Sequence, residues 1–102
     1  MTEKQRARIE TIEKQILQLI RQYGSYKLSG YNICKVIAFG NENNIASKTI
    51  PETPENYDSK KFNVIKQQVY IALKRLVDVK KIMFKEVEYG NRKIATKFYR
   101  LA

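Results

Sequence analysis

Apolar residues recur every three or four positions in the first quarter of the chain. The repeat consists of Ile9, Ile12, Ile16, Leu19 and Tyr23. This spacing places side chains on one face of an α-helix. Thr2 and Gln5 have the spacing of a capping box, and Gly24 is typical of the residue that follows a helix. We therefore expect a helix from Thr2 to Tyr23.

Two more helices are expected further along. Ser29 suits the N-cap of a helix that runs to about Ala38, and Gly40 would stop it. Residues 62–64 alternate between apolar and polar side chains, which favours an extended segment that leads into a third helix over 65–79. The buried stripe of this third helix would consist of Val69, Ala72, Leu73 and Leu76.

The remaining segments predict a long loop and a hairpin. Residues 41–59 are rich in Asn, Ser and Thr and contain both prolines, so we expect a loop there. Residues 82–87 and 95–101 are strand-like, and Gly90 between them supplies the positive φ that hairpin turns often need. A short extended piece is also expected at 26–28.

These elements predict an α+β fold formed by residues 1–102 as a single domain. It would have three helices and a C-terminal two-stranded β-hairpin. This order is typical of a winged helix-turn-helix, in which the third helix enters the major groove of DNA and the hairpin, or wing, contacts the backbone or minor groove nearby.

Composition excludes several kinds of chemistry. The chain has no histidine and one cysteine, Cys34. A Cys–His zinc site, a Cys–His nucleophile pair and a Ser–His–Asp triad are therefore excluded, and we expect neither an enzyme nor a bound metal or cofactor. No small-molecule substrate is evident. No apolar run is long enough to span a membrane and no secretory signal is visible, so a cytoplasmic protein without a membrane partner is expected.

The net charge of +10 is unevenly distributed. Residues 59–102 carry twelve Lys and Arg against three Asp and Glu, whereas residues 41–58 carry one against four. Positive charge concentrated on one segment indicates a polyanionic partner, either a nucleic acid or an anionic membrane surface. DNA would repel the acidic segment 41–58, so we expect this segment to face away from the DNA.

Three stretches resemble the PadR-like winged-helix transcriptional regulators. They are residues 28–33 (LSGYNI), 69–76 (VYIALKRL) and 98–101 (FYRL). They are similar to the second helix, the recognition helix and the end of the wing in that family, and the resemblance covers roughly residues 16–101. The chain departs from the family at Lys80, where the family usually has a glycine. The resemblance implies sequence-specific binding of double-stranded DNA by a transcriptional regulator.

On this basis we expect DNA contacts from the third helix and the wing. The candidates are Lys66, Gln67, Gln68, Tyr70, Lys74, Arg75, Tyr89, Arg92 and Lys93. Lys66, Gln67 and Gln68 would lie in the first turn of the helix, where backbone N–H groups and the helix dipole favour phosphate. Gln pairs well with adenine, and Arg with guanine. The alternative is that these side chains only keep an exposed face soluble, and that Tyr70 packs in the core.

The start of the first helix suggests a homodimer. Ile9 and Ile12 continue the apolar stripe of Ile16 beyond the expected core, so a second chain would have to cover them. The expected dimer surface consists of Ile9, Ile12 and Ile16. The alternative is a helix that begins later, after a frayed start. A homodimer would place two recognition helices about one DNA turn apart. A winged helix that binds RNA or another protein is the alternative to the whole hypothesis.

Overall fold

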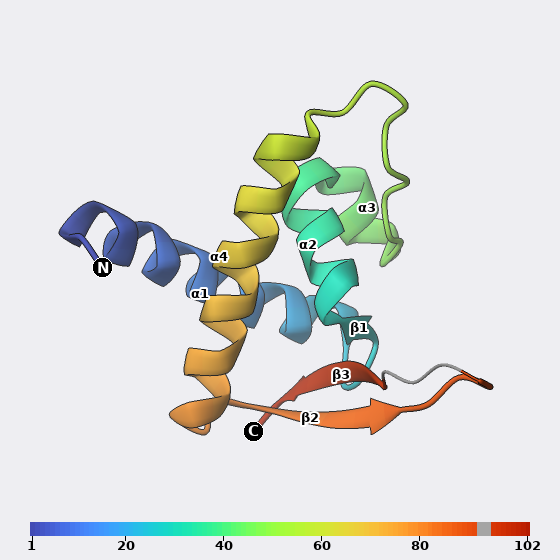
Figure 1. The fold of residues 1–102 in the computed structure, drawn as a ribbon. Coiled ribbons are helices and arrows are strands. Elements are labelled where there is room, and N and C mark those ends of the chain that lie inside the picture. The colour runs from blue at the N-terminus through green and yellow to red at the C-terminus, as the bar shows by residue number, and fades with distance from the viewer. Residues whose placement is uncertain (92–94) are drawn as a thin grey trace.

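The computed structural model describes residues 1–91 and 95–102, which form four helices and a three-stranded antiparallel sheet (Figure 1). The elements in chain order are α1 (Glu3–Tyr23), β1 (Leu28–Ser29), α2 (Gly30–Phe39), α3 (Glu42–Ser47), α4 (Ser59–Asp78), β2 (Ile82–Val87) and β3 (Thr96–Leu101). The α+β class is therefore confirmed. No helix within the described ranges is long and apolar enough to cross a membrane.

Local signals set both ends of α1, as predicted. The Thr2 side chain accepts a hydrogen bond from the backbone N–H of Gln5 at 3.2 Å, and the Gln5 side chain accepts one from the Thr2 N–H at 3.0 Å. This reciprocal pair is a capping box. At the other end, Gly24 follows the helix with a φ of 109°, which favours glycine.

Helix α1 is buried along its whole apolar stripe by the chain's own core, chiefly by α4, which crosses it (Figure 1). Ile9, Ile12 and Ile16 are 3%, 5% and 0% exposed. Ile9 lines a shallow hollow together with Val64 and Ile71 of α4. The premise that a second chain must cover Ile9 and Ile12 is therefore wrong, and these residues belong to the core of the single chain.

The segment expected to be a loop, 41–59, contains the short helix α3. Asn41 and Asn44 form a reciprocal capping pair, with both hydrogen bonds at 3.1 Å. The hydroxyl of Tyr23 donates to the carbonyl oxygens of Asn44 and Thr49, at 3.2 and 2.7 Å, which holds α3 against the end of α1. A buried aromatic hydroxyl thus fixes a segment whose composition suggested irregular structure.

The last helix, α4, begins six residues before the predicted start at 65. The carboxylate of Asp58 caps it by accepting from the N–H groups of Lys60 and Lys61, at 3.0 and 3.1 Å. Residues 62–64 are therefore helical rather than extended, because Phe62 is buried against α2 while Val64 points outward at 50% exposure. The helix end near 79 agrees with the prediction.

The sheet has the strand order β1-β3-β2, so it contains one strand more than the predicted two-stranded hairpin. Leu28 pairs with Tyr99 and Ser29 with Phe98, which ties the start of α2 to β3. In the hairpin, Phe84 pairs with Tyr99. The turn has its positive φ of 56° at Gly90, as expected.

Lys80 occupies a position whose backbone conformation favours glycine. Its φ is 61°, in the left-handed region, and its N–H donates to the carbonyl of Val77 at 3.0 Å. The N–H of Lys81 donates to the carbonyl of Leu76 at 2.9 Å. This bond pattern is that of a Schellman helix end. The exit turn therefore has the geometry that suits glycine even though the residue is lysine.

Candidate nucleic-acid interface

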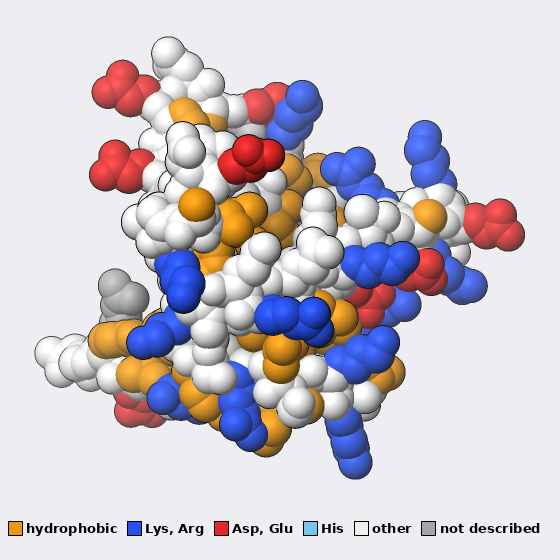
Figure 2. All heavy atoms as spheres, turned by 180° about the vertical axis from the view of Figure 1, so that it is seen from behind, with side chains coloured by type: hydrophobic (Ala, Val, Ile, Leu, Met, Phe, Trp, Pro, Cys, Tyr) orange, Lys and Arg blue, Asp and Glu red, His pale blue; other side chains and the backbone are white. Residues whose placement is uncertain are grey.

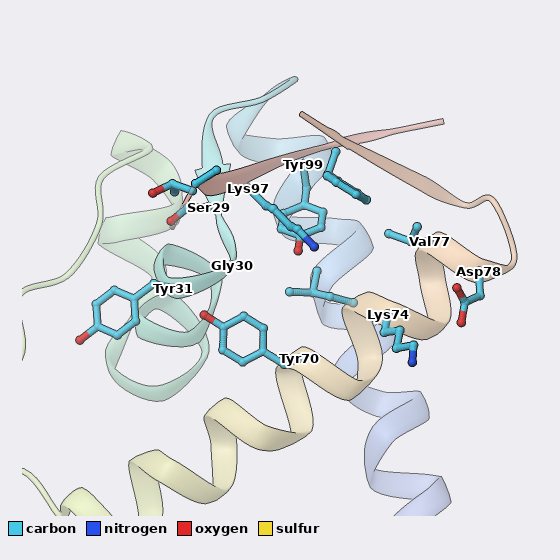
Figure 3. A pocket seen from close by; sticks show the side chains of 13 residues that line it. Ser29, Gly30, Tyr31, Tyr70, Lys74, Val77, Asp78, Lys97 and Tyr99 are labelled. Atoms are coloured by element: carbon cyan, nitrogen blue, oxygen red, sulfur yellow. The ribbon is translucent and has the colours of Figure 1, made fainter. Parts of the chain in front are cut away.

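A groove of about 660 Å³ separates the C-terminal half of α4 from the hairpin (Figure 3). The start of α2 closes one end of it. Lys97 and Tyr99 point from β3 toward α4, and Tyr70 and Lys74 lie on the helix opposite them (Figure 3). Residues of α2, α4 and the hairpin thus meet around one concave surface.

The closest approach in the groove is between α2 and α4, and it requires a glycine. A Cβ atom on Gly30 would lie 2.9 Å from Cε1 of Tyr70. Tyr70 therefore packs edge-on against the first turn of α2 while 45% of it stays exposed to the groove. Burial of the ring raises the pKa of its hydroxyl. Tyr70 is thus both a packing residue and an exposed aromatic, so the two alternatives stated for it from the sequence are not exclusive.

The start of α2 also presents backbone donors to the groove. Ser29 caps the helix by accepting from the N–H of Asn32 at 3.1 Å. Gly30 and Tyr31, which line the groove, are the first residues of the helix, where N–H groups lack partners within the helix. Such a terminus favours anions.

Lysines flank the groove on both sides. Lys74 lies on α4, and Lys97 lies on β3 with its Nζ 4.6 Å from the ring centre of Phe84. Lys66, nearer the start of α4, has its Nζ 5.8 Å from the ring of Tyr31. Of the described residues that line the groove, Asp78 alone is acidic. The groove therefore has a surplus of positive charge.

The predicted contact residues of α4 fall into two groups. Lys66, Tyr70 and Lys74 lie on the side of the helix that faces α2 and the hairpin, and Gln67 is exposed. Gln68 and Arg75 instead face α1. The side chain of Gln68 accepts from Nε of Arg8 at 2.9 Å, and Arg75 forms an ion pair with Glu13 at 3.3 Å. The structure thus does not bring these two residues to the groove.

The expected position of Lys66, Gln67 and Gln68 at the start of the recognition helix is wrong. Because α4 begins at Ser59, these residues lie about two turns inside the helix rather than at its start. Backbone N–H groups at that depth donate to carbonyls of the preceding turn, so they are not open to a phosphate. Any contact at 66–68 must come from the side chains.

The far end of the hairpin lies away from the groove. Tyr89 is 48% exposed there, beyond the end of β2. Arg92 and Lys93 lie outside the described residues. Figure 2 shows that the face opposite to that of Figure 1 also carries many Lys and Arg side chains, with several acidic ones gathered at one end. The groove is lined by Lys74 and Lys97 against Asp78, and positive charge is also spread over the opposite face of the molecule.

Sequence reasoning missed three residues of this surface. Lys97 reaches the groove because alternate residues of β3 face α4. Tyr31 was not among the predicted contacts, yet it lines the groove and is 46% exposed. Ile71 is 43% exposed and lies one turn after Gln67, next to it on the outer face of α4. An exposed isoleucine on that face was the available signal.

Beneath the groove, the side chain of Cys34 is buried. Its exposure is 0%, and burial raises the pKa of its thiol to about 11. Burial likewise raises the pKa of Tyr99 to about 12. Both groups are neutral at physiological pH. They serve as apolar packing below the charged surface.

Comparison with known proteins gave no match to any family model, curated protein or solved structure. The resemblance to PadR-like regulators therefore stays a prediction.

Proposed function

We propose that this chain is a winged-helix protein that binds double-stranded DNA and regulates transcription. The observation that carries the proposal is the groove, in which a helix, a helix N-terminus and a β-hairpin surround a concave surface with lysines on both sides. In the winged-helix arrangement these three parts would be the recognition helix, the second helix and the wing.

The exposed face of α4 has side chains suited to base edges. Gln67 and Ile71 are neighbours one turn apart, and both are accessible. A glutamine can pair with adenine through two hydrogen bonds, and an apolar side chain can contact the methyl group of thymine. We infer that this face enters the major groove and prefers sites that contain A·T pairs.

Phosphates would be held at the borders of the groove. Lys74 and Lys97 stand on opposite sides of it, and the first turn of α2 adds backbone donors from Gly30 and Tyr31. Contacts of this kind position a protein on the duplex and supply most of its salt-dependent affinity.

The acidic segment lies at the other end of α4. Glu52 and Glu55 are exposed in the connection before the helix, whereas the hairpin follows its C-terminal end (Figure 1). Their repulsion of phosphate would direct the duplex toward the hairpin end. The expected homodimer stays a prediction, and the three isoleucines first assigned to it do not form its surface.

Binding of RNA is the second candidate function. Tyr31 and Tyr70 are both nearly half exposed beside the groove, and exposed aromatic rings can stack on unpaired bases. A duplex keeps its bases stacked on one another and would not use the rings in this way. A competition between the two nucleic acids distinguishes the two functions.

The experiment is a competition for a fluorescent DNA duplex, followed by anisotropy, with unlabelled duplex or a structured RNA as competitor. We expect duplex to compete more strongly than RNA. The variant Lys74→Ala/Lys97→Ala should bind duplex weakly, whereas Lys4→Ala/Lys14→Ala, with the same net charge, should bind like the wild type because both lysines are exposed on α1. Stronger competition by RNA would favour the second function, and equal loss in both variants would contradict a specific groove.

A further inference from the structure

The hairpin carries a second group of cations on the face that points away from α4. Lys85 and Arg100 both lie against the ring of Tyr26, with Nζ 4.6 Å and the guanidinium carbon 5.7 Å from its centre. Nη2 of Arg100 also lies 3.3 Å from the sulfur of Met83, its partner across the strands. We call Tyr26, Met83, Lys85 and Arg100 the outer patch.

The outer patch is held in place by backbone structure. Tyr26 has a φ of 58°, in the left-handed region, and its N–H donates to the carbonyl of Tyr99 at 2.9 Å. This bond fixes the tight turn between α1 and β1 beside β3. The aromatic ring then attracts both cations through its negatively polarised face. The backbone bond of Tyr26 and the contacts of both cations with its ring therefore hold the patch in a defined arrangement.

The charges of the outer patch are not balanced by protein groups. Among residues 1–91 and 95–102 the ion pair between Arg75 and Glu13 is the one present, and it does not involve the patch. Nε of Arg100 is buried and has no hydrogen-bond acceptor in the described part of the chain. The outward residues of β2 and β3 include no carboxylate, because Glu86 pairs with Lys97 on the inner face. The two like charges of Lys85 and Arg100 on one surface would be satisfied by an anion such as a phosphate.

The outer patch and the groove lie on opposite faces of the same strands. Phe84, Lys97 and Tyr99 line the groove, whereas Met83, Lys85 and Arg100 alternate with them and point the other way. The patch also sits near the root of the hairpin, beside Tyr26, rather than at its tip. A duplex in the groove would not reach it. The outer patch and the groove are therefore two separate cationic surfaces.

We propose that the outer patch binds the phosphate backbone of a second DNA duplex, so that one chain bridges two duplexes. The inference rests on the proposed function, because the first duplex would occupy the groove. A bridging protein joins separate segments of DNA, which a protein with one binding face does only by forming a dimer. The bridge here would be built into the single chain.

The test is a co-capture assay. One duplex is fixed to beads, protein is added, and capture of a second, fluorescent duplex is measured at about 50 mM salt, where phosphate contacts are strong. The variants are Lys85→Glu, which reverses an exposed charge of the patch, and Lys4→Glu, which changes the net charge equally on α1. Affinity for one duplex is measured separately by anisotropy for each protein.

We expect Lys85→Glu to lower capture by about tenfold, equivalent to about 1.4 kcal/mol, with near wild-type affinity for a single duplex, and Lys4→Glu to keep both. Capture that survives Lys85→Glu would overturn the proposal and point to a dimer as the bridge. A parallel loss of capture and of single-duplex affinity would also overturn it, since the patch would then belong to the first site. If the wild type bound no duplex in the anisotropy assay, the proposed function itself would fail, and the bridge with it.

Discussion

The substitution Ile12→Ala tests whether the N-terminal half of α1 belongs to the core of one chain. Ile12 is 5% exposed, so nearly all of its side chain leaves water on folding. The change removes three carbon groups, each contributing about 0.8 kcal/mol when buried, and adds the cost of the cavity. We therefore expect a loss of about 3 kcal/mol in the free energy of unfolding. For a domain of this size the melting temperature should fall by about 12–24 °C.

The matched control is Ile71→Ala on α4, which removes the same atoms from a side chain that is 43% exposed. It should cost about 1 kcal/mol, because less surface is returned to water and no closed cavity forms. Urea unfolding gives the free energies, and sedimentation gives the mass of each variant. Two results would refute the reasoning: equal losses in the two variants, or an Ile12→Ala protein that loses mass by dissociation of a dimer.

Two further predictions concern Cys34 of α2 and Arg75 of α4. The Cys34 thiol has its pKa raised from 9.0 to about 11 by burial, so its contribution to stability should be lost as the pH rises from about 9 to about 11. The free energy of unfolding, measured in urea, should therefore decrease less from pH 8 to pH 10 for Cys34→Ala than for the wild type. An equal decrease in the two proteins would contradict this prediction. The variant Arg75→Gln should cost less than about 1 kcal/mol, because the Arg75 side chain is 38% exposed and solvent screens its ion pair with Glu13. Its affinity for duplex, measured by anisotropy, should not change, and a clear loss would show that Arg75 reaches DNA.

Short-range signals in the sequence predicted the helix ends well. Thr2, Ser29 and Gly24 act through bonds or dihedral angles within a few residues, so their role can be read without the rest of the chain. The strand bounds of the hairpin and the turn at Gly90 were predictable for the same reason.

The errors arose where distant contacts decide the structure. The contact of the Tyr23 hydroxyl with α3 joins segments about twenty residues apart, which composition does not reveal. The cap of α3 by Asn41 is local, but it lies in a segment whose composition favoured a loop. The early start of α4 depends on Asp58 and on the burial of Phe62. The longer α4 packs against α1, and Ile9 and Ile12 are therefore buried without a second chain.

The candidate site was predictable in part for a related reason. Charge and helical spacing placed Lys66 and Lys74 on the α4 face beside the groove. They could not show that Arg75 turns toward α1, because that depends on the angle at which α1 crosses α4. Lys97 was missed because its position depends on the register of β3 against β2.

The most direct test of DNA binding at the groove is the salt dependence of duplex affinity. Each lysine that contacts a phosphate contributes about one unit to the slope of log affinity against log salt. We expect a slope of about −5 to −7 for the wild type and a slope about two units shallower for Lys74→Ala/Lys97→Ala. The control Lys4→Ala/Lys14→Ala should keep the wild-type slope. A slope that is flat in the wild type, or unchanged when Lys74 and Lys97 are removed, would contradict the binding of DNA in the groove.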